Sequence, residues 1–256
     1  MTRVLVAVKR VADISGEVVL TADQQGLDGR FTGYTIGVHD ACAIELAIRV
    51  AEAGDGSVTV MSVGDAAASD QIRSALALGA GAAILVEADP TTMGPADVAS
   101  EIAAVVTSAA EAGWAYDLVV LGNDAADTGD FQVPVRLAHV LRRPVVTGAR
   151  MLTVTDGVLV AQVLGPYAEE TYELPLPAVA SVLEGGAEPR YPTLRGRMAA
   201  RKVEIEVRSP AGAPTGGGRV RWHVPPATSG AAEVLGEGPS AAPAVVGVLE
   251  KLGVLR

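Results

Sequence analysis

Four short apolar runs, each separated from the next by a helical pattern, constrain the fold of this chain more than any other feature. A strand followed by a helix and then by another strand specifies right-handed βαβ units and a parallel sheet. We therefore predict an α/β fold in which helices flank a parallel, twisted, Rossmann-like sheet. The four runs are "VLVAV" at 4–8, "VTVMSV" at 58–63, "AILVE" at 83–87 and "LVVLG" at 118–122.

The helices between these runs have recognisable ends. Asp40 is in position to cap a helix that continues to about Glu52, and "ASDQIRSALALG" should end at Gly79. A third helix should begin with Pro95 in its first turn and stop at Gly113. Apolar residues make up 49% of the chain but aromatic residues only 4%, so small aliphatic side chains must fill the core between helices and sheet.

The second part of the chain has a different rhythm. Asp156-Gly157 joins two β-rich runs in "MLTVTDGVLVAQVL", which is a strong hairpin signal, and further strand-like segments occur at 171–182 and 202–207. Between Ser209 and Pro243, 13 of 35 residues are Gly or Pro, which is typical of an extended segment.

These patterns predict two parts. The first is a nucleotide-binding-type α/β domain at 1–207 with a β-rich extension near its C-terminal end. The second, at 208–256, is an extended arm that ends in a short helix too short to be stable alone.

Charge and cysteine content exclude several classes of protein. The formal net charge of -10 argues against general nucleic-acid binding, which requires a basic face. No stretch approaches 18 consecutive apolar residues, so we expect no membrane insertion. The single cysteine, Cys42, cannot form an internal disulfide and no Cys/His cluster has zinc spacing, which favours the cytoplasm.

The loop "GNDAADTGDFQVP" at 122–134 is the strongest ligand-binding candidate, because ligands of parallel sheets lie beyond the carboxyl ends of the strands. Gly122 and Gly129 permit close backbone approach, and a helix from about Gln132 would present free N–H groups to an anion. The alternative is a solvated turn in which Asp and Asn cap the helix. Spacing alone does not decide between them, although the aspartates would repel a phosphate.

The segment "EPRYPTLRGRMAARK" at 188–202 is a local basic patch on an acidic chain. Pro189 and Pro192 stiffen the backbone, so Leu194 would be presented on a firm loop. One interpretation is a helix from about Arg197 whose basic residues compensate its C-terminal dipole. The interpretation we favour is a docking site, in which basic residues attract an acidic partner and the leucine provides the apolar anchor.

No catalytic constellation accompanies these features. The histidines, His39, His139 and His223, have no nucleophile nearby in the sequence, so we expect a protein that converts no substrate itself.

Five stretches, taken in order, resemble the β subunit of electron transfer flavoproteins, and the resemblance runs from about residue 3 to 207. They are "VLVAVKRVAD", "AIELAIRVAEAG", "IRSALALGAGAAILV", "DLVVLGNDAADTGDFQVP" and "LPAVASVLEGGAEPRYPTLRGRMAARK".

The resemblance implies an adenine nucleotide alpha hydrolase-like fold and a heterodimer with an α subunit that holds most of a redox-active FAD. The β subunit of such proteins shields the flavin and in many members binds AMP, whereas in electron-bifurcating members a second FAD takes that place. Electrons arrive from a flavin dehydrogenase and leave to a quinone reductase-type acceptor.

The resemblance also implies roles for particular residues. The nucleotide-contacting positions correspond to Ala7, Gly37, Val63, Asp127, Thr128, Phe131, Gln132 and Val133. Two positions that face flavin in some members correspond to Ile14 and His39. The docking surface corresponds to Arg190, Tyr191, Leu194, Arg195, Arg197 and Lys202, with Leu194 as the inserted leucine.

Three of these positions depart from the family pattern. Gly37 and Phe131 stand where the family has Asn, and Val133 stands where it has Thr, so side-chain donors are lost.

An alternative from another functional class is a nucleotide-binding stress or signalling protein of related α/β topology, which would be a homodimer.

Overall fold

The computed structural model describes residues 1–13, 18–217, 221–224 and 233–255. The chain divides into two compact units, Met1–Trp222 and His223–Arg256, and each is described by itself.

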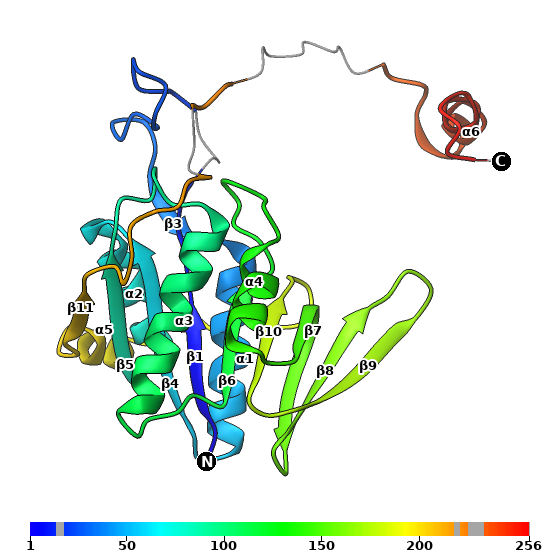
Figure 1. The fold of residues 1–256 in the computed structure, drawn as a ribbon. Helices are drawn as coiled ribbons and strands as arrows, with labels where there is room; N and C mark the ends of the chain where they lie inside the picture. The colour runs from blue at the N-terminus through cyan, green and yellow to red at the C-terminus, as the bar shows by residue number, and fades with distance from the viewer. Residues whose placement is uncertain (14–17, 218–220, 225–232, 256) are drawn as a thin grey trace. The chain divides into compact units, whose positions relative to one another are not determined.

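The first unit is built on one nine-stranded sheet with the order β11-β5-β4-β1-β6-β10-β7-β8-β9 (Figure 1). All pairings from β11 to β7 are parallel, and the pairings β7–β8 and β8–β9 are antiparallel. The predicted α/β fold with a parallel sheet is thus confirmed. The strands are β1 Arg3–Ala7, β4 Ser57–Gly64, β5 Ala82–Glu87, β6 Leu118–Gly122, β7 Val145–Thr155, β8 Val158–Leu164, β9 Glu169–Pro175, β10 Ala178–Val182 and β11 Ile205–Arg208.

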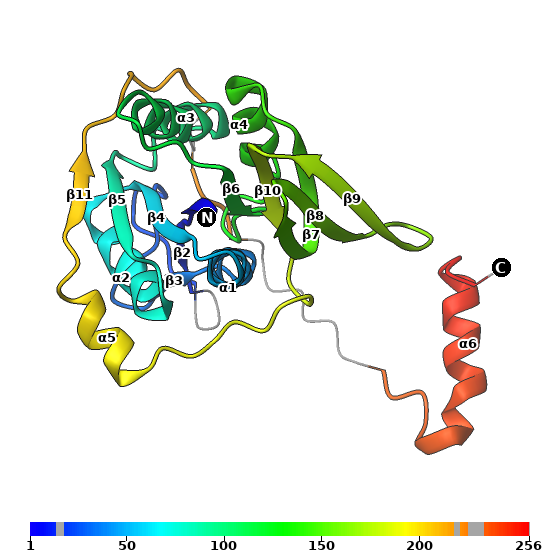
Figure 2. The same ribbon diagram turned by 90° about the horizontal axis from the view of Figure 1, so that it is seen from below.

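Helices cover both faces of the sheet (Figure 2). Within β1, Val4 and Val6 pack into the core on the α1 and α2 side, whereas Leu5 and Ala7 pack into the core on the α3 and α4 side. This alternation explains why the central strands are apolar at every position. The helices of this unit are α1 Val38–Ala53, α2 Ser69–Leu78, α3 Pro95–Glu111, α4 Val133–Leu141 and α5 Leu194–Ala200, with a 3₁₀ turn at Ala66–Ala68.

The predicted turn signals are confirmed. Asp156 and Gly157 have φ values of 51° and 77°, the pair of positive angles that a two-residue hairpin turn requires, and they join β7 to β8. Gly79 follows α2 with φ 136°, as expected of a helix-terminating glycine. The run predicted at 171–182 is divided, because β9 ends at Pro175 and β10 begins at Ala178.

Two predicted helix starts were wrong. Asp40 does not cap α1: Gly37 is the cap residue, and Asp40 lies buried inside the first turn. The helix expected from about Arg197 begins at Leu194, because the hydroxyl of Thr193 accepts a hydrogen bond from Gly196 N–H at 3.0 Å. Leu194 is therefore the first residue of a helix and not part of a loop.

A second, two-stranded sheet pairs β2 Arg10–Ala12 with β3 Tyr34–Ile36 and leads into α1. The unit His223–Arg256 contains a 3₁₀ turn at Gly238–Ala241 and helix α6 Ala242–Lys251, in agreement with the short helix expected there. Within the described part of the chain, the helices are all too short or too polar to span a bilayer.

Candidate functional site

The strand order reverses at β1, which places a topological switch point between β1 and β6. From β1 the chain continues to β4 and β5 on one side and then returns to β6 on the other side. The pairing of Ala7 with Leu121 brings the carboxyl ends of β1 and β6 to the same edge of the sheet. A ligand of such a sheet lies in the crevice outside this edge, which we call the carboxyl edge.

The residues predicted to contact a nucleotide all lie at the carboxyl edge. Ala7 ends β1, Val63 lies near the end of β4, and Gly37 caps α1. The others follow β6: Asp127 and Thr128 in the connecting turn, Phe131 before α4, Gln132 as the α4 cap, and Val133 as its first residue. Ile14 is outside the described residues.

Asp40 joins the two strands that form the switch point. Its carboxylate accepts hydrogen bonds from Lys9 N–H at 2.8 Å and from Gly122 N–H at 3.0 Å. A side chain on residue 122 would have no room, because a Cβ there would lie 2.3 Å from Asp40 Oδ1. Burial raises the pKa of Asp40 to about 6, and the two backbone donors only partly oppose this rise.

Lys9 and Asp127 form an ion pair across the same crevice. The Lys9 ammonium lies 2.7 Å from Asp127 Oδ1, with 36% of the lysine side chain and 13% of the aspartate side chain exposed. The pair links the segment after β1 to the turn after β6, so a residue predicted to contact a nucleotide is already engaged within the chain.

His39 lies between two carboxylates. Its Nδ1 faces Asp124 Oδ1 at 2.5 Å, and its Nε2 faces Glu184 Oε2. Ionised carboxylates only accept hydrogen bonds, so each carboxylate is an acceptor for a ring N–H that faces it. The backbone N–H of Glu184 itself, and then His39, hold the pKa of the Glu184 carboxyl below its ordinary value. The two contacts fix the plane of the imidazole ring.

The turn after β6 uses much of its own hydrogen-bonding capacity. The N–H groups of Thr128 and Gly129 both donate to Ala125 O, at 3.2 and 2.8 Å. The side-chain oxygen of Gln132 accepts two hydrogen bonds from Arg136. Phe131 is 57% exposed and has φ 55°, a left-handed conformation unusual for an aromatic residue.

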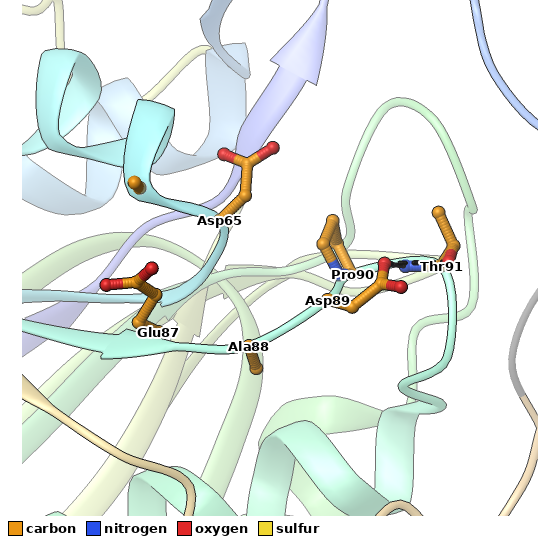
Figure 3. Close-up of a pocket in the computed structure, with 7 residues that line it drawn as sticks. Asp65, Glu87, Ala88, Asp89, Pro90 and Thr91 are labelled. Atoms are coloured by element: carbon orange, nitrogen blue, oxygen red, sulfur yellow. Dashed lines mark hydrogen bonds between the residues drawn. The ribbon is translucent and has the colours of Figure 1, made fainter.

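A separate hollow of about 410 Å³ lies at the ends of β4 and β5, lined in part by the carboxylates of Asp65, Glu87 and Asp89 (Figure 3). Asp89 accepts hydrogen bonds from the N–H and hydroxyl of Thr91, at 2.9 and 2.7 Å. None of the predicted nucleotide-contacting residues lines this hollow. Its carboxylates would repel an anion, so it is a poor substitute for a phosphate site.

The second candidate site is segment 188–202, which we call the docking segment. Its first arginine is held by the chain itself: the guanidinium of Arg190 lies 2.8 Å from Glu45 Oε2 and 2.8 Å from Glu52 Oε1, both on α1. Glu45 also pairs with Arg49 at 2.6 Å. Burial alone would raise the pKa of Glu45, but the bonds from Arg190 and Arg49 outweigh it and lower that pKa.

Helix α5 is fixed on the body of the domain by close contacts. A Cβ on Gly196 would lie 2.4 Å from Ala77 O, so only glycine lets α5 approach α2 this closely. Arg73 donates to Ala200 O and Val203 O at 2.6 and 2.5 Å, which ties down the C-terminal end of α5. The helix is therefore held at both ends.

The outer side of the docking segment is apolar and basic. Leu194 is 77% exposed, Met198 58% and Tyr191 90%. Among the residues that the structure describes, no acidic partner pairs with the exposed cations of this segment. These cations are Arg195, Arg197, Arg201 and Lys202. The structure thus separates Arg190, which anchors the segment, from the arginines that follow it.

Sequence reasoning missed most of the charged network at the carboxyl edge. Lys9, Asp40, Asp124 and Glu184 come from four different segments, and only the fold brings them together. The position of Lys9 directly after β1 was the available signal, because side chains that follow parallel strands converge on the carboxyl edge.

Fold and site together define an α/β protein whose sheet has a topological switch point, with a separate helix, α5, that exposes apolar and basic side chains. The sequence model of the protein family "Electron transfer flavoprotein domain" matches residues 30–213. The chain belongs to the electron transfer flavoprotein β-subunit family.

Three relatives, each named "Electron transfer flavoprotein subunit beta", illustrate the similarity. The protein of Syntrophomonas wolfei is 32% identical over 88% of this chain and 86% of its own length. That of Mycobacterium tuberculosis is 33% identical over 81% of this chain and 79% of its own. The human protein is 34% identical over 81% of each chain.

Proposed function

We propose that this chain is the β subunit of a heterodimeric electron transfer flavoprotein that works in the cytoplasm. It takes electrons from a flavin dehydrogenase and passes them to a quinone reductase-type acceptor, with the FAD held mainly by the α subunit. The chain converts no substrate itself. The observation that carries the proposal is the docking segment, where exposed Leu194 lies among basic residues that have no partner within the described chain.

The docking segment suits a partner that must bind and leave repeatedly. The exposed basic residues would speed encounter with an acidic surface, and their contribution to affinity would be small. The exposed leucine, on a helix whose position is fixed, would supply the apolar contact that decides the complex. Arg190 acts as the support of this surface, because its guanidinium is bound to Glu45 and Glu52.

The carboxyl edge suits the covering of a flavin held by another subunit. FAD, when bound, carries the electrons. Val38 and Phe131 are exposed apolar side chains at the N-terminal ends of α1 and α4, and such side chains would exclude water from a flavin ring. His39 is held by Asp124 and Glu184, so it would present a ring of fixed orientation at this edge.

Leu194→Ala tests the docking role. We expect it to slow electron uptake from the donor dehydrogenase about 30-fold, as for a hot-spot residue that contributes about 2 kcal/mol, without changing flavin content or thermal stability. Stopped-flow reduction of the heterodimer by the donor measures this rate. Leu252→Ala is the matched control, because Leu252 is 71% exposed, close to the 77% of Leu194, and lies outside the docking segment. An unchanged rate in Leu194→Ala would remove the anchoring role.

Purification tests the wider proposal. A yellow one-to-one complex with a larger subunit is the expected result. A colourless homodimer that binds ATP would instead support the nucleotide-binding signalling protein considered above.

A further inference from the structure

The carboxyl edge of this chain does not fit the nucleotide that the family resemblance implies for it. We infer that this edge holds neither AMP nor a second FAD, because the chain's own groups occupy several of the donors that a phosphate would use and the loop beside them is acidic. The inference rests on the proposed function, since it predicts that the heterodimer carries a single FAD.

The backbone donors at the switch point are already used. Asp40 takes the N–H groups of Lys9 and Gly122, and Val182 O accepts the N–H of Asn123 at 2.9 Å. In the following turn, Ala125 O takes the N–H groups of Thr128 and Gly129. A phosphate would have to displace these hydrogen bonds, and the buried Asp40 carboxylate and Val182 carbonyl would then be left unsatisfied.

The nearby cations are engaged as well. Lys9 pairs with Asp127 at 2.7 Å. Arg10 stacks on the ring of Tyr34, 3.4 Å from its centroid. Arg136 is bound to the side-chain oxygen of Gln132. A phosphate would have to compete for each of these groups with a partner that is already in place.

The charge and shape of the loop oppose an anion further. The sequence 122–135 contains three aspartates, Asp124, Asp127 and Asp130, and no Lys, Arg or His. The second residue of α4 is Pro134, which has no N–H, so the N-terminus of this helix offers one donor fewer than usual. Phe131 and Val133 add no side-chain donors.

The contacts at the carboxyl edge thus link segments of the chain that a bound nucleotide would otherwise link. Lys9–Asp127 and Asp40 connect the segment after β1 to the segment after β6. The edge should be closed and stable in the absence of any nucleotide, and the heterodimer should have no second flavin through which to divide electron pairs.

The test uses the purified heterodimer. Denaturation followed by mass spectrometry should release FAD as the only nucleotide, at one per heterodimer. Adding about 1 mM AMP should leave the Tm unchanged, whereas a site with a Kd near 10 μM would raise it by about 5 °C. Stoichiometric AMP, two FAD per heterodimer or an AMP-dependent rise in Tm would overturn the inference.

Failure of the proposed function gives a different result. If no α subunit or FAD accompanies the chain, the electron-transfer role fails, but the AMP titration still tests the carboxyl edge of the isolated chain. No Tm response supports the inference there, and a rise contradicts it.

A variant that adds donors at the carboxyl edge tests which side chains exclude AMP. Combining Asp127→Asn, Phe131→Asn and Val133→Thr weakens the hold on Lys9, because a neutral amide replaces the carboxylate, and adds donors. Asn also tolerates the left-handed conformation of residue 131 better than Phe does. We expect AMP to raise the Tm of this variant. Asp28→Asn, which removes a carboxylate paired with Arg30 and 17% exposed, outside the turn after β6, is the control and should not respond. Absence of a response in the triple variant would contradict the assignment of exclusion to these side chains.

Discussion

The carboxyl edge and the docking segment are both rich in charge, but they use it in opposite ways. At the carboxyl edge, Lys9 forms an ion pair with Asp127, and His39 lies against the carboxylates of Asp124 and Glu184, all within the chain. In the docking segment, Arg190 is the cation that pairs with an acid among the described residues, and the cations that follow it are exposed. The difference teaches that local charge density does not reveal a binding surface. What matters is whether the fold supplies a partner.

The largest loss of stability is expected when a side chain is added in the space that the Asp40 carboxylate occupies. Gly122→Ala would place a Cβ 2.3 Å from Asp40 Oδ1 and force the carboxylate away from its two N–H donors. We expect a loss of about 3 kcal/mol in the free energy of unfolding, measured by chemical denaturation. Gly33→Ala is the control, because a Cβ there meets nothing within 4 Å. Equal stability of the two variants would show that the edge is not an internal network.

The next largest loss of stability is expected at Arg190, which, unlike the other arginines of the docking segment, pairs with acids among the described residues. Arg190→Met would leave Glu45, whose side chain is 4% exposed, with Arg49 as its remaining cation. We expect a loss of about 2 to 3 kcal/mol, less than for a pair broken completely, and faster amide exchange in α5. Arg201→Met should change stability by less than about 0.5 kcal/mol. Similar losses of stability in both variants would contradict the distinction between Arg190, which supports the docking segment, and the exposed arginines on its surface.

The raised pKa of Asp40 predicts that the free energy of unfolding depends on pH. Because the folded protein raises the pKa of this carboxyl from 3.8 to about 6, it holds the proton more tightly than the unfolded chain does. The contribution of Asp40 to stability should therefore fall as pH rises from about 4, through the folded pKa, to about 7, and level off above that range. The stability difference between wild type and Asp40→Asn should decline by about 2 kcal/mol over this interval. A constant difference would show that Asp40 is already ionised at the lower pH.

The smallest effect on stability is expected where charge faces outward. Replacing Arg195 and Arg197 with Gln should leave the free energy of unfolding within about 0.5 kcal/mol of wild type. Association with the donor dehydrogenase should slow several-fold at low ionic strength and show weaker salt dependence. Stopped-flow measurements at two salt concentrations check this. A large stability loss would mean that these arginines serve the fold.

The fold could be predicted because its signals are local. The apolar runs and the Asp156-Gly157 turn each act within a few residues, and both predictions were confirmed. The role of Asp40 could not be predicted from the sequence, because its partners Lys9 and Gly122 lie 31 and 82 residues away. A local capping rule instead assigns Asp40 to the helix end.

The docking segment shows the same limit. Its exposed Leu194 stood out in the sequence, and the structure confirms the exposure. The binding of Arg190 to Glu45, 145 residues away, could not be inferred from the surrounding sequence. Long-range ion pairs carry no local pattern, so basic residues with and without partners look alike until the chain is folded.

The fixed position of α5 has a consequence for how a complex forms. Contacts on both sides of the helix order it before any partner arrives: Arg190 on α1, Gly196 against Ala77, Arg73 at the end of α5, and β11 paired with β5. Binding of the proposed partner would therefore carry little of the entropy loss that ordering a flexible loop would add, about 0.5–1.5 kcal/mol for each side chain immobilised. In the proposed docking role, a small contact surface would then suffice for recognition, and its small size would let the partners separate after each transfer.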